Sequence, residues 1–233
     1  MNLTLKESLV TRSRVFSPWT AFYFLQSLLI NLGLGYPFSL LYTAAFTAIL
    51  LLLWRTLPGV QKVLVGVSSL VAACYFPFAQ AYGAPNFNTL LALHSTNMEE
   101  STEILTIFPW YSYLVGIFIF ALGVIAIRRK KESEKARWNT FDSLCLVFSV
   151  ATFFVAPVQN LAWGGVFKLK DTGYPVFRFA KDVIVNNNEV IEEQERMAKL
   201  SGMKDTWTVT AVKPKYQTYV VVIGESARRD ALG

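Results

Sequence analysis

The residues best suited to chemistry fall in two short stretches, the first of which is STNMEESTE. It carries hydroxyl, amide and carboxylate side chains at Thr96, Asn97, Glu99, Glu100 and Glu103. On one helix, Thr96 and Glu100 would be four residues apart and Glu100 and Glu103 three, so several of these groups would share a face. Such a cluster of carboxylates suits a cationic ligand, for example an ammonium group. The alternative is an acidic loop that only avoids positive charge.

The second stretch is YVVVIGESARRDALG, at residues 219–233. Tyr219 to Ile223 have the character of a buried strand, and Gly224 permits a sharp turn after them. Open α/β sheets place their sites just beyond the carboxyl ends of strands, so Glu225 is positioned to bind a divalent metal. The pattern alone has low specificity, because any buried parallel strand and its turn would look similar. His94, the single histidine, does not suffice for a metal site.

The composition indicates a membrane protein. Hydrophobic residues make up 53% of the 233 residues and charged residues only 16%. The charges leave four long gaps, between Arg14 and Arg55, Lys62 and Glu99, Glu103 and Arg128, and Asp142 and Lys168. Each gap contains an apolar run able to cross about 30 Å of hydrocarbon, which takes about 20 helical residues. A polytopic membrane protein is therefore expected.

Five membrane-spanning helices are predicted within a transmembrane domain of residues 1–163. The first gap is long enough for two of them, because Gly33, Gly35 and Pro37 in NLGLGYPF favour a tight turn. The predicted spans cover residues 19–34, 38–54, 62–82, 109–127 and 141–163. Cys74 and Cys145 fall inside these spans and are expected to be buried thiols rather than a disulfide.

The distribution of basic residues predicts the orientation. Lys and Arg are concentrated in the N-terminal segment, in the connection between the second and third spans, and in the RRKKESEKAR run between the fourth and fifth. The turn at 33–37 and the loop at 83–108 contain none. The positive-inside rule therefore places the N-terminus in the cytoplasm and everything after Trp163 outside. Because the same rule accounts for the basic run within a net charge of +6, nucleic acid is not expected as a partner.

Residues 164–215 form a predicted connector. A helix is expected from Asn188 to Leu200, with Gly202 as its stop. Residues Tyr174 to Val185 mix apolar and charged side chains and suit either the outer membrane–water boundary or packing against a soluble domain. Residues 216–233 are expected to begin that further domain.

Both stretches resemble a known family. YVVVIGESARRDALG resembles the opening of the periplasmic domain of membrane-anchored phosphoethanolamine transferases, which belong to the alkaline phosphatase and sulfatase superfamily. STNMEESTE resembles the Thr-x-x-x-Glu element that this family carries between its third and fourth spans. The order of five spans, connector and strand is also similar to the family's layout. The family modifies lipid A, lipopolysaccharide core sugars and periplasmic glucans, and the chain looks most like the enterobacterial members that modify osmoregulated periplasmic glucans.

The resemblance implies a mainly α chain, with a five-helix membrane domain, an amphipathic connector and the first strand of a truncated α/β domain of the alkaline-phosphatase type. It implies an inner-membrane enzyme that moves phosphoethanolamine from phosphatidylethanolamine to a periplasmic glycan. By position, Glu225 matches the family's first zinc ligand. Thr96 and Glu100 match residues that contact the donor headgroup, with Asn97 and Glu103 beside them as further candidates. Ala92 departs from the family, which often has asparagine there.

The resemblance places the family's threonine nucleophile and its remaining zinc ligands beyond Gly233. It therefore implies that these 233 residues are the N-terminal part of a longer, zinc-dependent enzyme and are inactive alone. An alternative from another class is a non-enzymatic membrane scaffold or assembly protein. A transporter is disfavoured because the predicted spans contain almost no ionisable residues.

Overall fold

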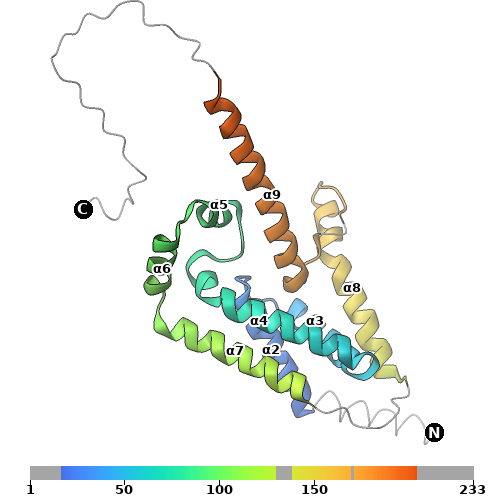
Figure 1. Ribbon diagram of the computed structural model, residues 1–233. Coiled ribbons are helices and arrows are strands. Elements are labelled where there is room, and N and C mark those ends of the chain that lie inside the picture. The colour runs from blue at the N-terminus through green and yellow to red at the C-terminus, as the bar shows by residue number, and fades with distance from the viewer. Residues whose placement is uncertain (1–16, 130–137, 169–170, 204–233) are drawn as a thin grey trace, which may run out of the picture. The chain divides into compact units, whose positions relative to one another are not determined.

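Helices form the architecture of the residues that the structure, a computed structural model, describes: 17–129, 138–168 and 171–203. They are α2 (Pro18–Gly33), α3 (Leu40–Thr56), α4 (Pro58–Tyr82), α5 (Phe87–Ser95), α6 (Met98–Ile107), α7 (Trp110–Arg128), α8 (Thr140–Ala162) and α9 (Pro175–Ser201) (Figure 1). No strand occurs among these described residues. The prediction of a mainly α chain is confirmed to that extent, and the predicted strand Tyr219–Ile223 lies outside the described residues.

Each of the five predicted spans corresponds to one long helix, with ends that differ by four residues at most. The largest difference is at α4, which begins at Pro58 rather than Lys62, because proline suits the first helical turn. Of the described helices, α4, α7 and α8 are long and apolar enough to cross a membrane, with mean hydropathies of 1.6, 2.1 and 1.9. The helices α2 and α3 have 16 and 17 residues, fewer than the usual span of about 20, so the five-span topology stays a prediction.

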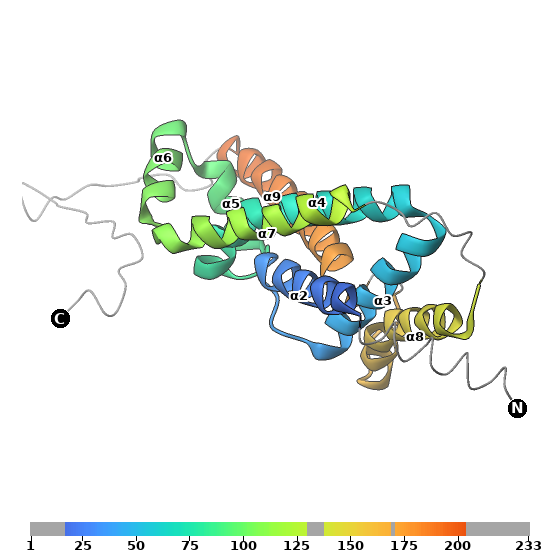
Figure 2. The same ribbon diagram turned by 90° about the horizontal axis from the view of Figure 1, so that it is seen from below.

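The helical bundle lies within the first of two compact units, residues 1–194 and 195–233. Within it, α4 and α7 lie side by side (Figure 2), and glycines let their backbones approach closely. A Cβ on Gly116 would lie 2.7 Å from the carbonyl oxygen of Ala73, and one on Gly123 would lie 2.6 Å from the Cβ of Ser69. This close contact fixes the position of α7 and therefore the place where α6 connects to its first residue.

Two amide side chains of α2 donate hydrogen bonds to neighbouring helices inside the bundle. Gln26 of α2 donates to the hydroxyl of Ser69 in α4 at 3.0 Å. Asn31 of α2 donates to the hydroxyl of Thr43 in α3 at 2.9 Å. All four residues are buried, and an unpaired polar group in hydrocarbon is costly. These hydrogen bonds therefore hold α2 against both of its neighbours.

A buried ion pair holds one end of the bundle together. Arg55, in the last turn of α3, pairs with Asp142, in the first turn of α8, and also donates to the side chain of Asn139 at 3.2 Å. Asn139 and Asp142 in turn form the capping box that begins α8. The side chain of Asp142 is only 3% exposed. This network joins α3 to α8 at the end of the bundle opposite the turn between α2 and α3.

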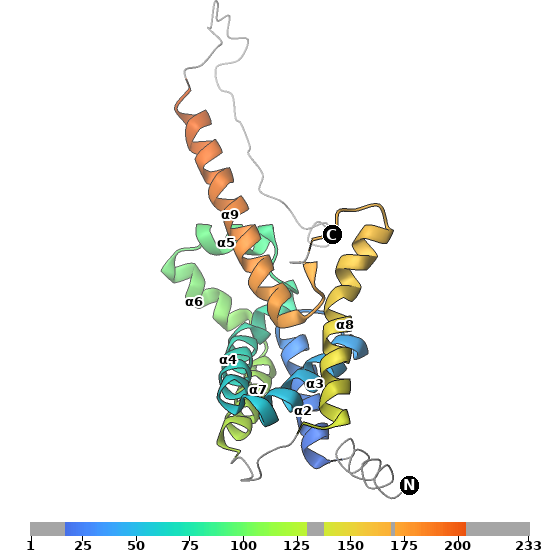
Figure 3. The ribbon, with the colours of Figure 1, turned by 90° about the vertical axis from the view of Figure 1, so that its right-hand side faces the viewer.

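The described part of the connector contains one continuous helix, α9, rather than two separate segments at 174–185 and 188–200. Its first turns pack against the bundle (Figure 3), a contact that the sequence analysis did not predict. The hydroxyl of Tyr174 donates to the carbonyl of Ser149 at 2.9 Å, and its ring centre lies 5.9 Å from that of Tyr42. The ring of Phe179 lies 5.0 Å from that of Tyr75. Tyr174 and Phe179 thus pack on aromatic residues of α3 and α4.

Candidate functional site

The first predicted site lies on two short helices that connect α4 to α7. α5 begins after Asn86, whose side chain accepts a hydrogen bond from the backbone N–H of Thr89 at 3.1 Å. The hydroxyl of Thr96 donates to the carbonyl of Ala92 at 2.6 Å. The helix breaks at this point, so that Thr96 ends α5 and the next residue, Asn97, caps α6.

Asn97 and Glu100 form a capping box at the start of α6. The Asn97 side chain accepts from the backbone N–H of Glu100 at 2.9 Å, and the Glu100 carboxylate accepts from the backbone N–H of Asn97 at 3.3 Å. The expectation that Thr96 and Glu100 share one helical face is wrong, because the helix breaks between them. Glu100 and Glu103 do lie on one helix, three residues apart.

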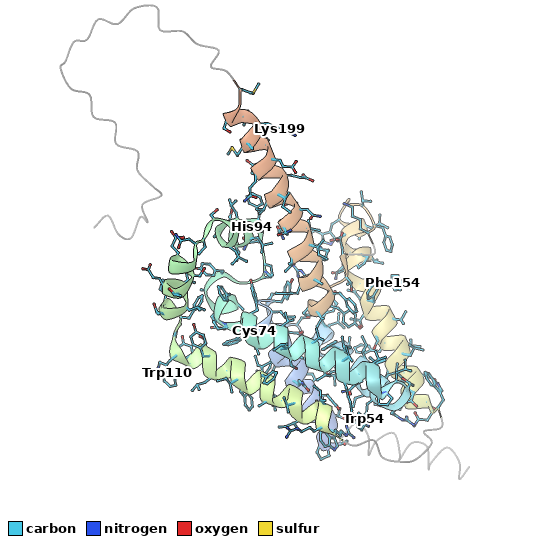
Figure 4. The ribbon with its side chains drawn as sticks, viewed as in Figure 1. Trp54, Cys74, His94, Trp110, Phe154 and Lys199 are labelled. Atoms are coloured by element: carbon cyan, nitrogen blue, oxygen red, sulfur yellow. The ribbon has the colours of Figure 1, made fainter. Side chains whose placement is uncertain are left out.

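The helix α6, which carries Glu100 and Glu103, is followed directly by α7, whose first residue is Trp110. Glu100 and Glu103 are both exposed, and Trp110 is 73% exposed. Figure 4 shows Trp110 at this end of α7 and Trp54 near the opposite end. An exposed tryptophan at the end of an apolar helix is typical of a membrane–water boundary. The arrangement can therefore present exposed carboxylates to a cation.

A second set of polar side chains surrounds the first turns of α9. This α9 polar cluster, which the sequence analysis missed, consists of Tyr36, Asp171, Arg178, Lys181 and Asp182. The hydroxyl of Tyr36 donates to Asp182 at 2.7 Å, and the guanidinium of Arg178 lies 4.7 Å from the centre of the Tyr36 ring. The ammonium of Lys181 lies 3.2 Å from Asp171 and 3.5 Å from Asp182. The spacing of Arg178 and Asp182, i and i+4, was a detectable signal for an ion pair.

The surroundings raise the pKa of the tyrosine hydroxyls of this region above its ordinary value, which already lies above physiological pH. Burial raises the pKa of Tyr36, and the hydrogen bond to Asp182 and the charge of that carboxylate raise the pKa further. Burial raises the pKa of Tyr174 to about 12. Both side chains therefore remain neutral hydrogen-bond donors at physiological pH.

The described residues do not offer a zinc site. No group of three or more His, Cys, Asp or Glu side chains that could hold a metal ion occurs among them. His94 is exposed, and its Nδ1 lies 3.0 Å from the carbonyl oxygen of Leu90. The part of the chain that the structure describes therefore does not supply the ligand set that zinc needs.

The second predicted site lies outside the described residues, which end at Met203. This applies to Glu225, the predicted zinc ligand, and to Gly233, beyond which the resemblance places the threonine nucleophile. The structure gives no position for either residue. The assignment of Glu225 to zinc and the location of the nucleophile after Gly233 therefore both stay predictions.

The curated relatives of the chain are phosphoethanolamine transferases by name. The chain is 99% identical over all 233 residues to the phosphoethanolamine transferase OpgE of Escherichia coli K12, and it covers 44% of that protein. It is 24% identical over 162 residues to a Haemophilus influenzae protein provisionally named as a phosphoethanolamine transferase, a match that covers 70% of the chain and 30% of that protein. The chain thus spans less than half the length of these relatives. No family model and no solved structure matches it.

Proposed function

Because the chain belongs to the phosphoethanolamine transferase family, we propose that it forms the membrane part of an enzyme that moves phosphoethanolamine from phosphatidylethanolamine to a periplasmic glycan. The observation that carries this proposal is the 99% identity to the Escherichia coli transferase over the whole chain. A donor that is a membrane lipid agrees with three described helices able to cross a bilayer. Glucan and lipopolysaccharide sugars are the proposed classes of acceptor.

The acids of α6 are the proposed contacts for the donor's ammonium group. Glu100 and Glu103 are exposed on the short helix that precedes α7, and Thr96 and Asn97 add a hydroxyl and an amide. An exposed ion pair of this kind contributes on the order of 1 kcal/mol or less. A weak contact suits a lipid that is abundant in the bilayer and whose diacylglycerol part must leave after the transfer.

The proposed location is the bacterial inner membrane, with the N-terminus in the cytoplasm and the α5–α6 region and Glu225 on the periplasmic side. The basic residues at the opposite end of the bundle support this orientation. Arg55 lies in the last turn of α3 and Arg128 in the last turn of α7. Positive charge of this kind favours the cytoplasmic side of a membrane.

Zinc is the proposed cofactor of the complete enzyme, with Glu225 as one ligand. The proposal rests on the resemblance of the segment Gly224-Glu225-Ser226 to the family's first metal ligand. A bound zinc ion supplies positive charge that activates a hydroxyl nucleophile and stabilises phosphoryl oxygens. The threonine nucleophile and the remaining ligands are assigned to sequence beyond Gly233.

The activity is tested with the full-length protein that contains this chain, reconstituted in vesicles with phosphatidylethanolamine labelled in its headgroup. The expected result is release of diacylglycerol together with transfer of the label to an added glycan. Parallel reactions with a periplasmic glucan and with lipopolysaccharide core sugars identify the acceptor. Failure to release diacylglycerol with any acceptor would favour the non-enzymatic membrane scaffold.

In that assay, Glu100→Gln is expected to raise the KM for the lipid donor by up to about fivefold, with little change in kcat. Glutamine can keep the capping box of α6, so the variant removes the charge without disturbing the start of the helix. Glu192→Gln, which changes an exposed acid on α9, is the matched control and should leave KM unchanged. An unchanged KM in Glu100→Gln would mean that this carboxylate does not contact the donor.

A further inference from the structure

The start of α9, which carries most of the α9 polar cluster, lies alongside α8, one of the predicted membrane spans. The hydroxyl of Tyr174, the residue before α9, bonds to the carbonyl of Ser149, which lies 13 residues before Ala162 at the end of α8. At 1.5 Å per residue, this contact is about 20 Å from that end of α8. Figure 3 shows α9 beginning beside the middle of α8. The first turns of α9 therefore run alongside α8 rather than beyond its end.

The two basic residues of the cluster differ in how far their charges are neutralised. Lys181 lies between two carboxylates, those of Asp171 and Asp182. Arg178 approaches Asp182 from its Nε, at 3.6 Å, which is long for a hydrogen bond, and its side chain is 50% exposed. Its terminal nitrogens have no hydrogen-bond partner among the described residues. The Tyr36 ring thus covers one side of the guanidinium, and the terminal N–H groups remain available as hydrogen-bond donors.

These spare donors suit a phosphate group. A guanidinium is planar and can bind two oxygens of a phosphate through two parallel N–H···O bonds, a fixed geometry that an ammonium lacks. Basic side chains that lie beside membrane helices can bind lipid headgroups.

The helix also offers a surface for acyl chains. Phe177, next to Arg178, and Ile184, six residues after Arg178 along α9, are 50% and 61% exposed. Apolar side chains next to a half-exposed arginine match a ligand that has a charged head and apolar tails. A soluble anion would use the arginine but would gain nothing from the two apolar residues.

We propose that Arg178 binds the phosphate of a membrane phospholipid whose acyl chains lie along Phe177 and Ile184. The bound lipid links the start of α9 to the bilayer. Tyr36 is a positioning residue, because it occupies one oxygen of Asp182 and so limits the competition of that carboxylate for the guanidinium. This lipid position is distinct from the proposed contacts of α6 with the donor's ammonium group, and it does not require the transfer reaction.

Native mass spectrometry of the 233-residue chain in detergent micelles tests the ligand class. The chain is titrated with phosphatidylethanolamine, phosphatidylglycerol, diacylglycerol and inorganic phosphate. We expect both phospholipids to be retained, because they share the phosphodiester, and diacylglycerol to be lost. Inorganic phosphate should fail to displace the lipids. Retention of diacylglycerol equal to that of the phospholipids, or displacement by equimolar inorganic phosphate, would overturn the proposal.

Variants test the residues. Arg178→Gln is expected to weaken the affinity for both phospholipids about tenfold, and Arg178→Lys is expected to weaken it less. Lys199→Gln removes a basic residue from the last turn of α9 and is expected to leave the affinity unchanged. Equal affinity of Arg178→Gln and wild type, with equal helix content by circular dichroism, would overturn the proposal.

Tyr36→Phe keeps the ring and the charge of Arg178 but frees one oxygen of Asp182, so it is also expected to weaken lipid binding. This variant and Arg178→Lys decide the matter if Arg178→Gln does not fold. Wild-type affinity in both would overturn the proposal.

Discussion

Replacing Asp142 by alanine is expected to destabilise the helical bundle by about 3 to 5 kcal/mol. The substitution takes from Arg55 its carboxylate partner at the junction of α3 and α8, where the Asp142 side chain is almost fully buried. It also removes the oxygen that accepts a hydrogen bond from the backbone N–H of Asn139 at 3.0 Å, and so opens the capping box of α8. The single substitution thus removes the buried partner of the Arg55 charge and also weakens the start of α8.

Denaturant unfolding in detergent micelles, followed by circular dichroism, measures this effect. Glu192→Ala, which removes an exposed acid from α9, should change the free energy of unfolding by less than about 0.5 kcal/mol. The double variant Arg55→Met, Asp142→Leu should be more stable than Asp142→Ala, because neither charge remains. A loss below about 1 kcal/mol in Asp142→Ala, the value typical of exposed pairs, would contradict a structural role for this ion pair.

In the full-length protein, Glu225→Ala is expected to abolish both bound zinc and phosphoethanolamine transfer, while membrane insertion is unchanged. A structural or catalytic zinc ion has few protein ligands, so the loss of one carboxylate removes much of its affinity. The metal content of the purified protein measures the ligand role independently of activity. Asp230→Ala, which changes another acid of the same stretch, is the matched control and should retain zinc. Full zinc content in Glu225→Ala would refute the assignment.

The long helices could be predicted from the sequence because of a simple physical constraint. A run of about 20 residues without charge has few alternatives to a helix in hydrocarbon, and the gaps between charged residues located all five of these helices. The connector was harder to predict. Its residues 174–185 carry apolar and charged side chains together, and the structure shows that Tyr174 and Phe179 pack on the bundle.

The candidate site was predictable only in its local parts. Asn97 and Glu100 have the spacing of a capping box, a pattern that predicts a helix start at Met98 and therefore a break after Thr96. Treating the stretch as one helix overlooked that signal. By contrast, Tyr36 lies 146 residues from Asp182, a separation that no local pattern spans. Only the packing of α9 on the turn between α2 and α3 brings these two side chains together.

The most direct test of the proposed function is the side of the membrane on which α5 and α6 lie. Cys74 and Cys145 are replaced by alanine, and single cysteines are then introduced at two exposed positions, Ser95→Cys at the end of α5 and Gly59→Cys in the first turn of α4. Both are treated with a membrane-impermeant maleimide in spheroplasts. We predict that Ser95→Cys is labelled in intact spheroplasts and Gly59→Cys only after permeabilisation. The reverse pattern would place the acids of α6 in the cytoplasm, away from any periplasmic acceptor, and would contradict the proposed function.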